Sequence, residues 1–437
     1  VEFLKKDSGD SFVPFLYVNC TGVQNNGKNF ITFDGGSTVY NSKGETIIFS
    51  KAAYEQELLI INKNDFKKDL VERVEEDKTR EKYNALINGI RHIKDSTGMD
   101  DDPKFVVGMS GGIDSSVVAA LLVKAVGSDK VLGINMPTRY NSDKTKKAAE
   151  YVASQLDIPY FVAPIEDLVK VNEQVLENIK VFGEKGRLTT ANKENVQAKI
   201  RGTSILSNFA AMYGALFTNN GNKDEIALGY ATLYGDWGGA LSIIGDLTKA
   251  EVFDLAGYLN NEIYKKEVIP EILIPDRFFR FRKDQIEPSA ELKDNQVDPM
   301  KFGYHCALLE AITDYKKKSS SDIMKWYLEG SMEKNLGISF ELIKRYEIDK
   351  PEIFVKDLEW FYSGIKKAVF KRVQSPPIIA TSKSAYGYDI RESILPYENT
   401  IEHDELKKKI LKMELYKSNG GNEWWKKIIE GCILDHF

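Results

Sequence analysis

The segment Ser110–Ser116 has the residue types that bind a phosphate group. It reads Ser-Gly-Gly-Ile-Asp-Ser-Ser and lies between apolar runs that predict a strand at 105–109 and a helix at 114–126. Because the first turn of a helix has free N–H groups and a partial positive charge, it attracts phosphate, and glycines let the backbone come close to the anion. Asp114 adds an oxygen ligand for Mg²⁺, which would bridge the phosphates. The sequence therefore predicts a nucleotide site formed by Ser110, Gly111, Gly112, Asp114, Ser115 and Ser116.

A simpler interpretation of this segment is a Gly-Gly turn followed by a helix cap, which needs no ligand. The strand before it, the helix after it and a carboxylate at the place where a metal is needed together favour the nucleotide. The segment is not a Walker loop, because no Gly-Lys-Ser or Gly-Lys-Thr follows the glycines.

The elements after residue 104 alternate between strand and helix patterns. We expect strands at 105–109, 131–136, 160–163 and 226–229, and helices at 114–126, 144–156, 194–217 and 249–260. Strands that alternate with helices of this length predict an α/β fold with a doubly wound, Rossmann-type parallel sheet and right-handed crossovers. The phosphate segment then lies where the first parallel strand ends. Residues 270–300 are rich in proline and charge and predict an ordered loop over a site.

The composition of the 437 residues is that of a globular protein without bulk positive charge. Hydrophobic residues make up 42% and charged residues 29% of the chain, and the net charge is −5. An acidic chain argues against a nucleic-acid partner that is bound by bulk charge. The cysteines Cys20, Cys306 and Cys432 are far apart, which excludes a disulfide scaffold and a cysteine zinc site and is typical of a cytoplasmic protein. No apolar run of about 18 residues predicts a membrane span, so no membrane partner is expected.

Beyond the phosphate segment, six segments resemble NAD synthetases, a family of the ATP pyrophosphatase superfamily with the signature Ser-Gly-Gly-x-Asp-Ser. They occur in the order of that family: Glu194–Arg201, Asn220–Glu225, Gly229–Asp236, Gly245–Lys249, Glu287–Leu292 and Phe370–Arg372. The resemblance implies an adenine nucleotide α-hydrolase-like fold. It also implies a ligase that activates the carboxylate of nicotinate adenine dinucleotide with ATP, as an adenylate, and then amidates it with ammonia. AMP and pyrophosphate would be released.

The resemblance implies a role for each matching charged or hydroxyl residue. Asp114, Glu225 and Lys249 would be catalytic, and the two carboxylates would hold Mg²⁺. Lys249 and Ser289 would contact ATP. The residues implied to contact the dinucleotide are Lys199, Arg201, Lys223, Asp236 and Lys371. Since both substrates are polyanions, cations and a metal must neutralise them, although a solvated surface charge is the alternative for any single lysine or arginine.

The chain departs from the family pattern at four of these positions. Threonine is common where Ser289 and Asn220 stand, lysine where Leu233 stands, and aspartate where Ala240 stands. These departures bear on the individual substrate contacts and not on the class of reaction.

The amino-terminal part has a different pattern, with short strand signals between residues 12 and 62. Residues 15–19 and 33–37 resemble the last quarter of a nitrilase-type amidase domain of αββα architecture, which supplies ammonia in glutamine-dependent NAD synthetases. Three or four strands cannot easily bury both faces alone. We therefore predict a remnant of that domain at 1–64, a linker and packing helix at 65–103, and the synthetase domain at 104–437.

Cys20 is the one thiol near this amidase-like segment. A nitrilase-type site needs a glutamate, a lysine and a cysteine together, and we find no match to that set. A buried structural cysteine is therefore favoured over a nucleophile. We expect this chain to use ammonium salts rather than glutamine as its nitrogen source.

Three other functions stay open from the sequence. One is another adenylating amidotransferase, such as a GMP synthetase, although its amidase domain would be of a different, triad type. A tRNA-modifying relative would need a basic extension or paired cysteines. A nucleotide-binding protein without turnover is the third, and the intact Asp114 and Glu225 argue against it. The resemblance also makes a homo-oligomer the expected assembly.

Overall fold

The computed structural model describes residues 13–50, 54–67, 70–71, 77–96, 103–294, 296–313, 318–383, 385–386 and 400–418. Residues 1–12 of the predicted amidase remnant and 419–437 of the predicted synthetase domain lie outside the described residues. Among the helices that are described, none is long and apolar enough to cross a membrane.

An eight-stranded sheet forms the centre of the fold, in the order β2-β3-β13-β12-β11-β6-β7-β8. Six neighbouring strands pair in parallel, namely β6 (Lys104–Gly108), β7 (Val131–Asn135), β8 (Tyr160–Val162), β11 (Ala215–Asn219), β12 (Leu241–Ser242) and β13 (Ile378–Ala380). The strand β3 (Asn29–Asp34) pairs in parallel with β13, and β2 (Thr21–Asn25) pairs antiparallel with β3. The expected α/β sheet is confirmed, but it is mixed and largely parallel.

Alternate side chains of the strands serve two hydrophobic cores, one on each face of the sheet. Phe105 and Val107 point into the larger core, whereas Val106 between them belongs to the other. The larger core contains α2 (Lys78–Ser96), α3 (Ile113–Val126), α4 (Asp143–Leu156) and α9 (Lys249–Tyr258). The opposite core contains α5 (Glu166–Asn178), the π-helical turn η3 (Ile200–Leu206) and α7 (Ser207–Met212). Helices therefore cover both faces of the sheet.

Two predicted elements near the sheet are wrong. The helix expected at 194–217 ends with α7, after α6 (Thr190–Lys199) and η3, and the strand β11 begins at Ala215. The strand expected at 226–229 is the end of α8 (Lys223–Leu228). Asn222 and Glu225 form a capping box that starts α8, and Gly229, at φ 64°, ends it in the left-handed conformation. A short apolar run is buried in either structure, so its periodicity could not distinguish them.

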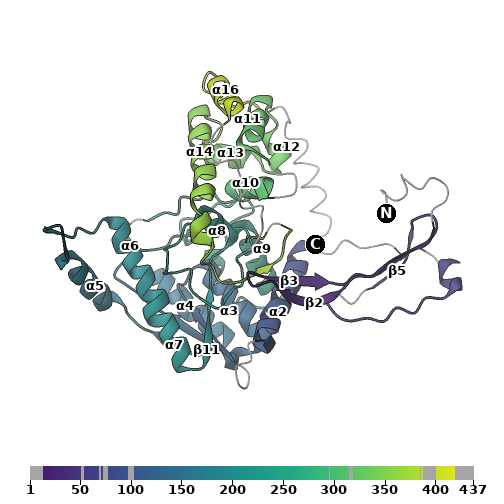
Figure 1. Ribbon diagram of the computed structural model, residues 1–437, viewed down its shortest axis with the longest axis horizontal. Coiled ribbons are helices and arrows are strands. Elements are labelled where there is room, and N and C mark those ends of the chain that lie inside the picture. The colour runs from purple at the N-terminus through teal and green to yellow at the C-terminus, as the bar shows by residue number, and fades with distance from the viewer. Residues whose placement is uncertain are drawn as a thin grey trace.

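A second lobe of helices stands above the sheet (Figure 1). It consists of α10 (Tyr304–Thr313), α11 (Ser320–Glu329), α12 (Met332–Leu336), α13 (Phe340–Arg345), α14 (Pro351–Lys367), α15 (Val369–Arg372) and α16 (Ile401–Ile410). Its core includes Tyr327 stacked on Phe354, with ring centroids 4.0 Å apart. Ile226 and Ala227 of α8 belong to the same core, so this lobe holds α8 in place.

The amino-terminal strands divide between two sheets. β1 (Phe15–Tyr17), β4 (Thr38–Tyr40) and β5 (Thr46–Phe49) form a small antiparallel sheet that extends away from the centre (Figure 1). β2 and β3 instead join the main sheet, so strand pairing crosses the predicted boundary at residue 64. The predicted division into three parts stays a prediction. The expected burial of Cys20 is wrong, because this thiol is exposed where the chain passes between the two sheets.

Candidate active site

A cavity of about 310 Å³ lies at the carboxyl ends of β6, β7 and β11. Its wall includes Ser110 after β6, Met136 after β7 and Asn220 after β11. After β6 the chain continues into β7 on one side of β6, whereas β11, which follows later in the chain, lies on the other side of β6. The order of the strands therefore reverses direction at β6. Ligands of open parallel sheets bind at such a switch point. Residues 286–292, within the loop predicted over a site, form a further wall.

The predicted phosphate loop joins β6 to α3 at this cavity. Gly112 is the residue before α3, and no side chain caps the helix, which leaves its first N–H groups for a ligand. The Ser110 hydroxyl accepts a hydrogen bond from the Gly112 N–H at 3.2 Å and lies 3.1 Å from the Ser115 hydroxyl. Ser110, Gly112 and Ser115 line the cavity, whereas the buried Ser116 donates to the Gly112 carbonyl at 2.8 Å and does not.

Gly111 is needed for the shape of this loop. Its φ is 86°, and a Cβ there would lie 1.9 Å from the Thr145 carbonyl oxygen. We expect Gly111→Ala to cost about 1–3 kcal/mol of stability through backbone strain, and to remove the stabilisation of the protein by ATP. Thermal unfolding with and without ATP measures both. Gly112→Ala is the matched control for backbone strain and should lose less stability, because φ is −86° there and the added Cβ would meet only Ser110 Oγ, at 3.4 Å. Equal losses in the two variants would contradict the prediction.

Asp114, Glu225 and Lys249 form a charged centre in the cavity wall. The ammonium of Lys249, 2% exposed, donates to the Asp114 carboxylate, which also accepts from Asn222 Nδ2 at 3.2 Å. Burial by itself would lower the pKa of Lys249, but Asp114 and Glu225 outweigh it and raise that pKa. Burial and the charge of Asp114 raise the pKa of Glu225 to about 8. The ammonium is paired with Asp114, and Glu225 is close enough for both charges to act on it, so this centre is short of positive charge.

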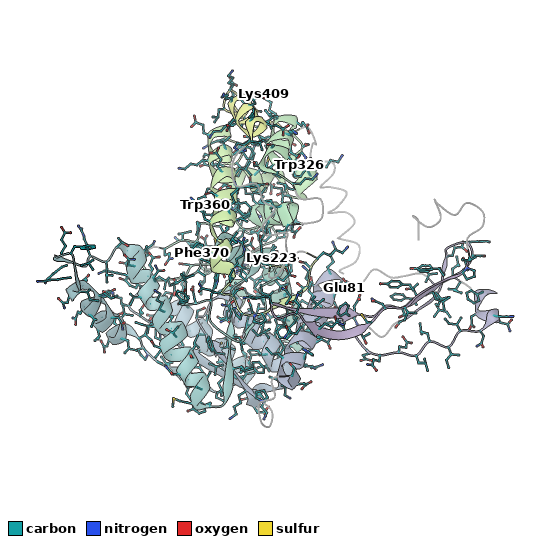
Figure 2. The ribbon with its side chains drawn as sticks, in the orientation of Figure 1. Glu81, Lys223, Trp326, Trp360, Phe370 and Lys409 are labelled. Carbon is teal, nitrogen blue, oxygen red and sulfur yellow. The ribbon has the colours of Figure 1, made fainter. Side chains whose placement is uncertain are left out.

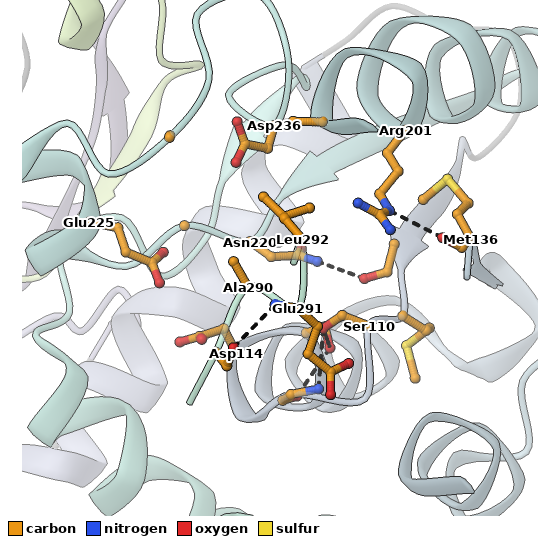
Figure 3. A pocket seen from close by; sticks show the side chains of 18 of the residues that line it. Ser110, Asp114, Met136, Arg201, Asn220, Glu225, Asp236, Ala290, Glu291 and Leu292 are labelled. Carbon is orange, nitrogen blue, oxygen red and sulfur yellow. Dashed lines mark hydrogen bonds between the residues drawn. The ribbon is translucent and has the colours of Figure 1, made fainter. Parts of the chain in front are cut away.

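A divalent cation fits this centre as a partner of the substrate phosphates. Asp114 and Glu225 lie on the same side of the cavity (Figure 3). Among the described residues, no group of three or more acidic, histidine or cysteine side chains forms a ready-made metal site. The Asp114 and Glu225 carboxylates suit Mg²⁺, which binds through one or two carboxylates and takes its remaining oxygens from phosphates and water.

Lys249 is held by the start of its own helix. Thr248 caps α9 together with Glu251, and the Lys249 N–H donates to Asp224 Oδ2 at 2.6 Å. Asp224 is buried and also accepts from the Cys306 thiol at 3.6 Å. The backbone of Lys249 is therefore fixed from the helical lobe, while its side chain reaches Asp114.

Arg201 lies on the opposite side of the cavity from Asp114 and Glu225 (Figure 3). Its Nε donates to the Met136 carbonyl at 3.1 Å, and its Nη2 donates to Asn141 Oδ1 at 3.4 Å. Burial lowers the pKa of Arg201 to about 10, so it stays charged at neutral pH. The cavity thus offers a helix start, a carboxylate pair and a separate guanidinium to an anionic ligand.

Residues 83–343 match the family described as NAD synthase. The chain belongs to this family. The glutamine-dependent NAD(+) synthetase of Thermotoga maritima is 30% identical over an alignment 430 residues long, which covers 90% of this chain and 66% of that protein. The NH(3)-dependent NAD(+) synthetase of Methanococcus aeolicus is 36% identical over 212 residues, 47% of this chain and 72% of that protein.

A solved structure gives the same assignment. The glutamine-dependent NAD+ synthetase from Acinetobacter baumannii, in complex with ADP, aligns with a TM-score of 0.55 and 26% identity over 88% of this chain. The alignment covers 62% of that protein. This chain therefore spans less than two thirds of the length of both glutamine-dependent relatives.

Within this member of the NAD synthase family, three predicted substrate contacts do not line the cavity. Lys223 is buried at the base of the helical lobe (Figure 2), and its ammonium is paired with Asp246 at 2.7 Å. Lys371 Nζ donates to the carbonyls of Gly229 and Ala231, both at 2.8 Å. Lys199 is exposed, outside the cavity. Lys371 therefore holds residues 229–231, which include part of the cavity wall. Lys223 and Lys199 are not part of the cavity wall.

The other predicted contacts do line the cavity. Asp236 lies near Arg201 (Figure 3) and accepts the Thr232 N–H at 2.6 Å. The Ser289 hydroxyl donates to the Gln296 carbonyl at 2.8 Å. Both side chains thus hold loops of the wall while they face the ligand space.

Sequence reasoning missed two acidic residues of the wall. Glu291 accepts from Asn141 Nδ2 at 3.1 Å and from the Thr145 hydroxyl at 2.9 Å, which holds its loop beside the phosphate loop. Asp298 lines the cavity with Asp114. It follows the Glu287–Leu292 segment by a few residues, and this proximity is the one sequence signal that could have identified it.

Proposed function

We propose that this chain catalyses the ATP-dependent amidation of nicotinate adenine dinucleotide to NAD, through an acyl adenylate. The observation that carries the proposal is the Asp114–Lys249–Glu225 centre beside the uncapped start of α3, in one cavity with Arg201. Membership of the NAD synthase family supports the same reaction.

In the first step, the nicotinate carboxylate attacks the α-phosphorus of ATP, and the bond to pyrophosphate breaks. The N–H groups at the start of α3 and the Ser110 and Ser115 hydroxyls bind phosphate oxygens. Lys249 contributes a positive charge where negative charge gathers on the phosphates. Asp114 and Glu225 would hold Mg²⁺, which when bound would neutralise the phosphates and the leaving pyrophosphate.

In the second step, ammonia attacks the carbonyl carbon of the adenylate, and the bond to AMP breaks. AMP is a good leaving group, so the step needs little acid–base assistance from the chain. Arg201 and Asp236, on the far wall, would hold the dinucleotide, and Ser289 would contact ATP. Lys371 would act on the dinucleotide indirectly, through residues 229–231.

The decisive assay incubates the chain with ATP, MgCl₂, ammonium chloride and nicotinate adenine dinucleotide. We expect AMP, pyrophosphate and NAD to form together and only when the dinucleotide is present. Product from xanthosine monophosphate instead would favour a GMP synthetase. ATP binding without AMP or pyrophosphate would favour a nucleotide-binding protein without turnover.

Arg201→Ala should raise the KM for the dinucleotide by about tenfold or more, because a hydrogen-bonded charge contact contributes about 1.5–3 kcal/mol. The KM for ATP should change less. Steady-state kinetics with each substrate varied measures the two constants. Lys199→Ala is the matched control, since Lys199 is a nearby cation that is exposed outside the cavity. A larger effect at Lys199 than at Arg201 would overturn this assignment.

The amidase-like origin of residues 1–64, the synthetase domain at 104–437 and the homo-oligomer remain proposals. Similarity to glutamine-dependent synthetases, over about two thirds of their length, supports the first. Exposed apolar side chains on and beside α5, among them Val171, Val175 and Phe182, are consistent with a protein partner for that surface.

A further inference from the structure

Asp298 is a carboxylate in a cavity that the proposed reaction fills with two polyanions. It lines the same wall as Glu225 and Lys249. Lys249 and Asp114 are close enough that their charges shift the pKa of Asp298 in opposite directions, while burial raises it. Neither ATP nor the dinucleotide gains from a further negative charge here, because like charges repel strongly where water is scarce.

The orientation of Asp298 is fixed by two neighbouring side chains. The Tyr230 hydroxyl donates to Asp298 Oδ1 at 3.2 Å, and Gln296 Nε2 donates to the Tyr230 hydroxyl at 3.2 Å. Burial and then the charge of Asp298 raise the pKa of Tyr230, so the phenol stays protonated and acts as the donor. A carboxylate oriented in this way is ready for a cationic partner on the cavity side.

The reaction has one cationic reactant to which no residue of the wall has yet been assigned. Asp236 and Glu291, two other acidic residues of the wall, accept hydrogen bonds from Thr232 and from Asn141 and Thr145 respectively, and these bonds hold their loops. Mg²⁺ is assigned to Asp114 and Glu225, and Lys249 already donates to Asp114. The nitrogen donor arrives in water mostly as ammonium, whose four N–H groups need acceptors. Charge-assisted hydrogen bonds to a carboxylate are the strongest that a side chain can offer it.

We propose that Asp298, oriented by Tyr230, binds the ammonium ion in this cavity. This rests on the proposed function and assigns its second substrate to a residue. Asp298 takes no part in the attack on the α-phosphorus, so the adenylation step does not need it. In the second step the bound ammonium gives one proton to the solvent, and the ammonia that is formed attacks the adenylate. AMP leaves, and the new amide loses a second proton to the solvent.

The test separates the two half-reactions in Asp298→Asn. Adenylation is followed as exchange of labelled pyrophosphate into ATP, with the dinucleotide present and ammonium absent. Amidation is followed as NAD formation over a range of ammonium chloride. We expect the KM for ammonium to rise about tenfold or more, with pyrophosphate exchange within about twofold of wild type. Tyr230→Phe should raise the same KM less, because the carboxylate remains.

Asp294→Asn is the matched control, an exposed aspartate outside the cavity on the same loop, and should leave both half-reactions unchanged. If Asp298→Asn lowers pyrophosphate exchange as much as NAD formation, or shifts the Mg²⁺ requirement, Asp298 belongs to the metal and ATP centre and the proposal is wrong. An unchanged KM for ammonium also overturns it. Absence of exchange in wild type, by contrast, would overturn the proposed function itself.

Discussion

Asp114→Asn is expected to abolish adenylation, with a loss of about a hundredfold or more, while the protein stays folded. The Asp114 carboxylate is the one that Lys249 and Asn222 both contact, next to the start of α3. An amide binds Mg²⁺ poorly, and a metal-stabilised transition state is worth several kcal/mol. The asparagine amide oxygen can still accept a hydrogen bond from the Lys249 ammonium, so we expect the variant to fold with reduced stability. Pyrophosphate exchange measures the loss, and circular dichroism with thermal unfolding checks the fold.

Two further variants make this prediction specific. Glu225→Gln should lose less, because glutamine at the same position of α8 preserves the capping box with Asn222 while it weakens the metal site. Asp143→Asn, in the first turn of α4 with an 89% exposed side chain, is the control and should keep full exchange. Near-normal exchange in Asp114→Asn at millimolar MgCl₂ would rule out the metal role.

The phosphate loop could be predicted from sequence because its signals are local. A buried strand, two glycines and an apolar helix follow one another within about twenty residues, and each has its own pattern. The geometry adds why each glycine is there: Gly111 because of its φ and the Thr145 carbonyl, and Gly112 because it leaves α3 uncapped.

The direction of the lysine side chains could not be predicted in the same way. Lys223, Lys249 and Lys371 all lie in family segments, and only Lys249 reaches the cavity. The direction of each ammonium depends on partners outside its own segment of the sequence, such as Asp246 for Lys223 and the Gly229 carbonyl for Lys371. A motif fixes residue types and spacing, whereas the nearest buried acceptor decides where an ammonium points.

Long-range strand pairing also explains why the position of the amino-terminal strands could not be predicted from the sequence. β3 lies beside β13, and Ile379 pairs with Phe30, although hundreds of residues separate them. The sequence shows only short strands with exposed edges. An unpaired edge strand is a liability, and β2 and β3 extend the edge of the main sheet beside β13.

Lys249→Met should both stop adenylation and destabilise the protein in the absence of metal. The side chain is 2% exposed and is paired with Asp114. Burial by itself would lower the pKa of Lys249, and the charges of Asp114 and Glu225 outweigh it. Removing one member of a buried ion pair costs about 3–5 kcal/mol, because the remaining charge is left uncompensated. Thermal and denaturant unfolding without Mg²⁺ measure this loss, and pyrophosphate exchange should fall by about a hundredfold or more.

The change in stability on adding Mg²⁺ distinguishes a metal site from a buried ion pair that binds no metal. In Lys249→Met the two carboxylates keep their place in the cavity, so added MgCl₂ should restore part of the lost stability. This gain should exceed the stability that MgCl₂ adds to wild type.

Lys223→Met is the matched control. It also removes a buried lysine, but leaves Asp246, which lies outside the cavity wall. Asp246 Oδ2 accepts the N–H groups of Thr381 and Ser382 at 2.7 and 2.6 Å. That variant should lose comparable stability and gain little from MgCl₂. Equal recovery of the two variants would mean that Asp114 and Glu225 are not a preferred cation site, and it would remove the basis for placing the metal there.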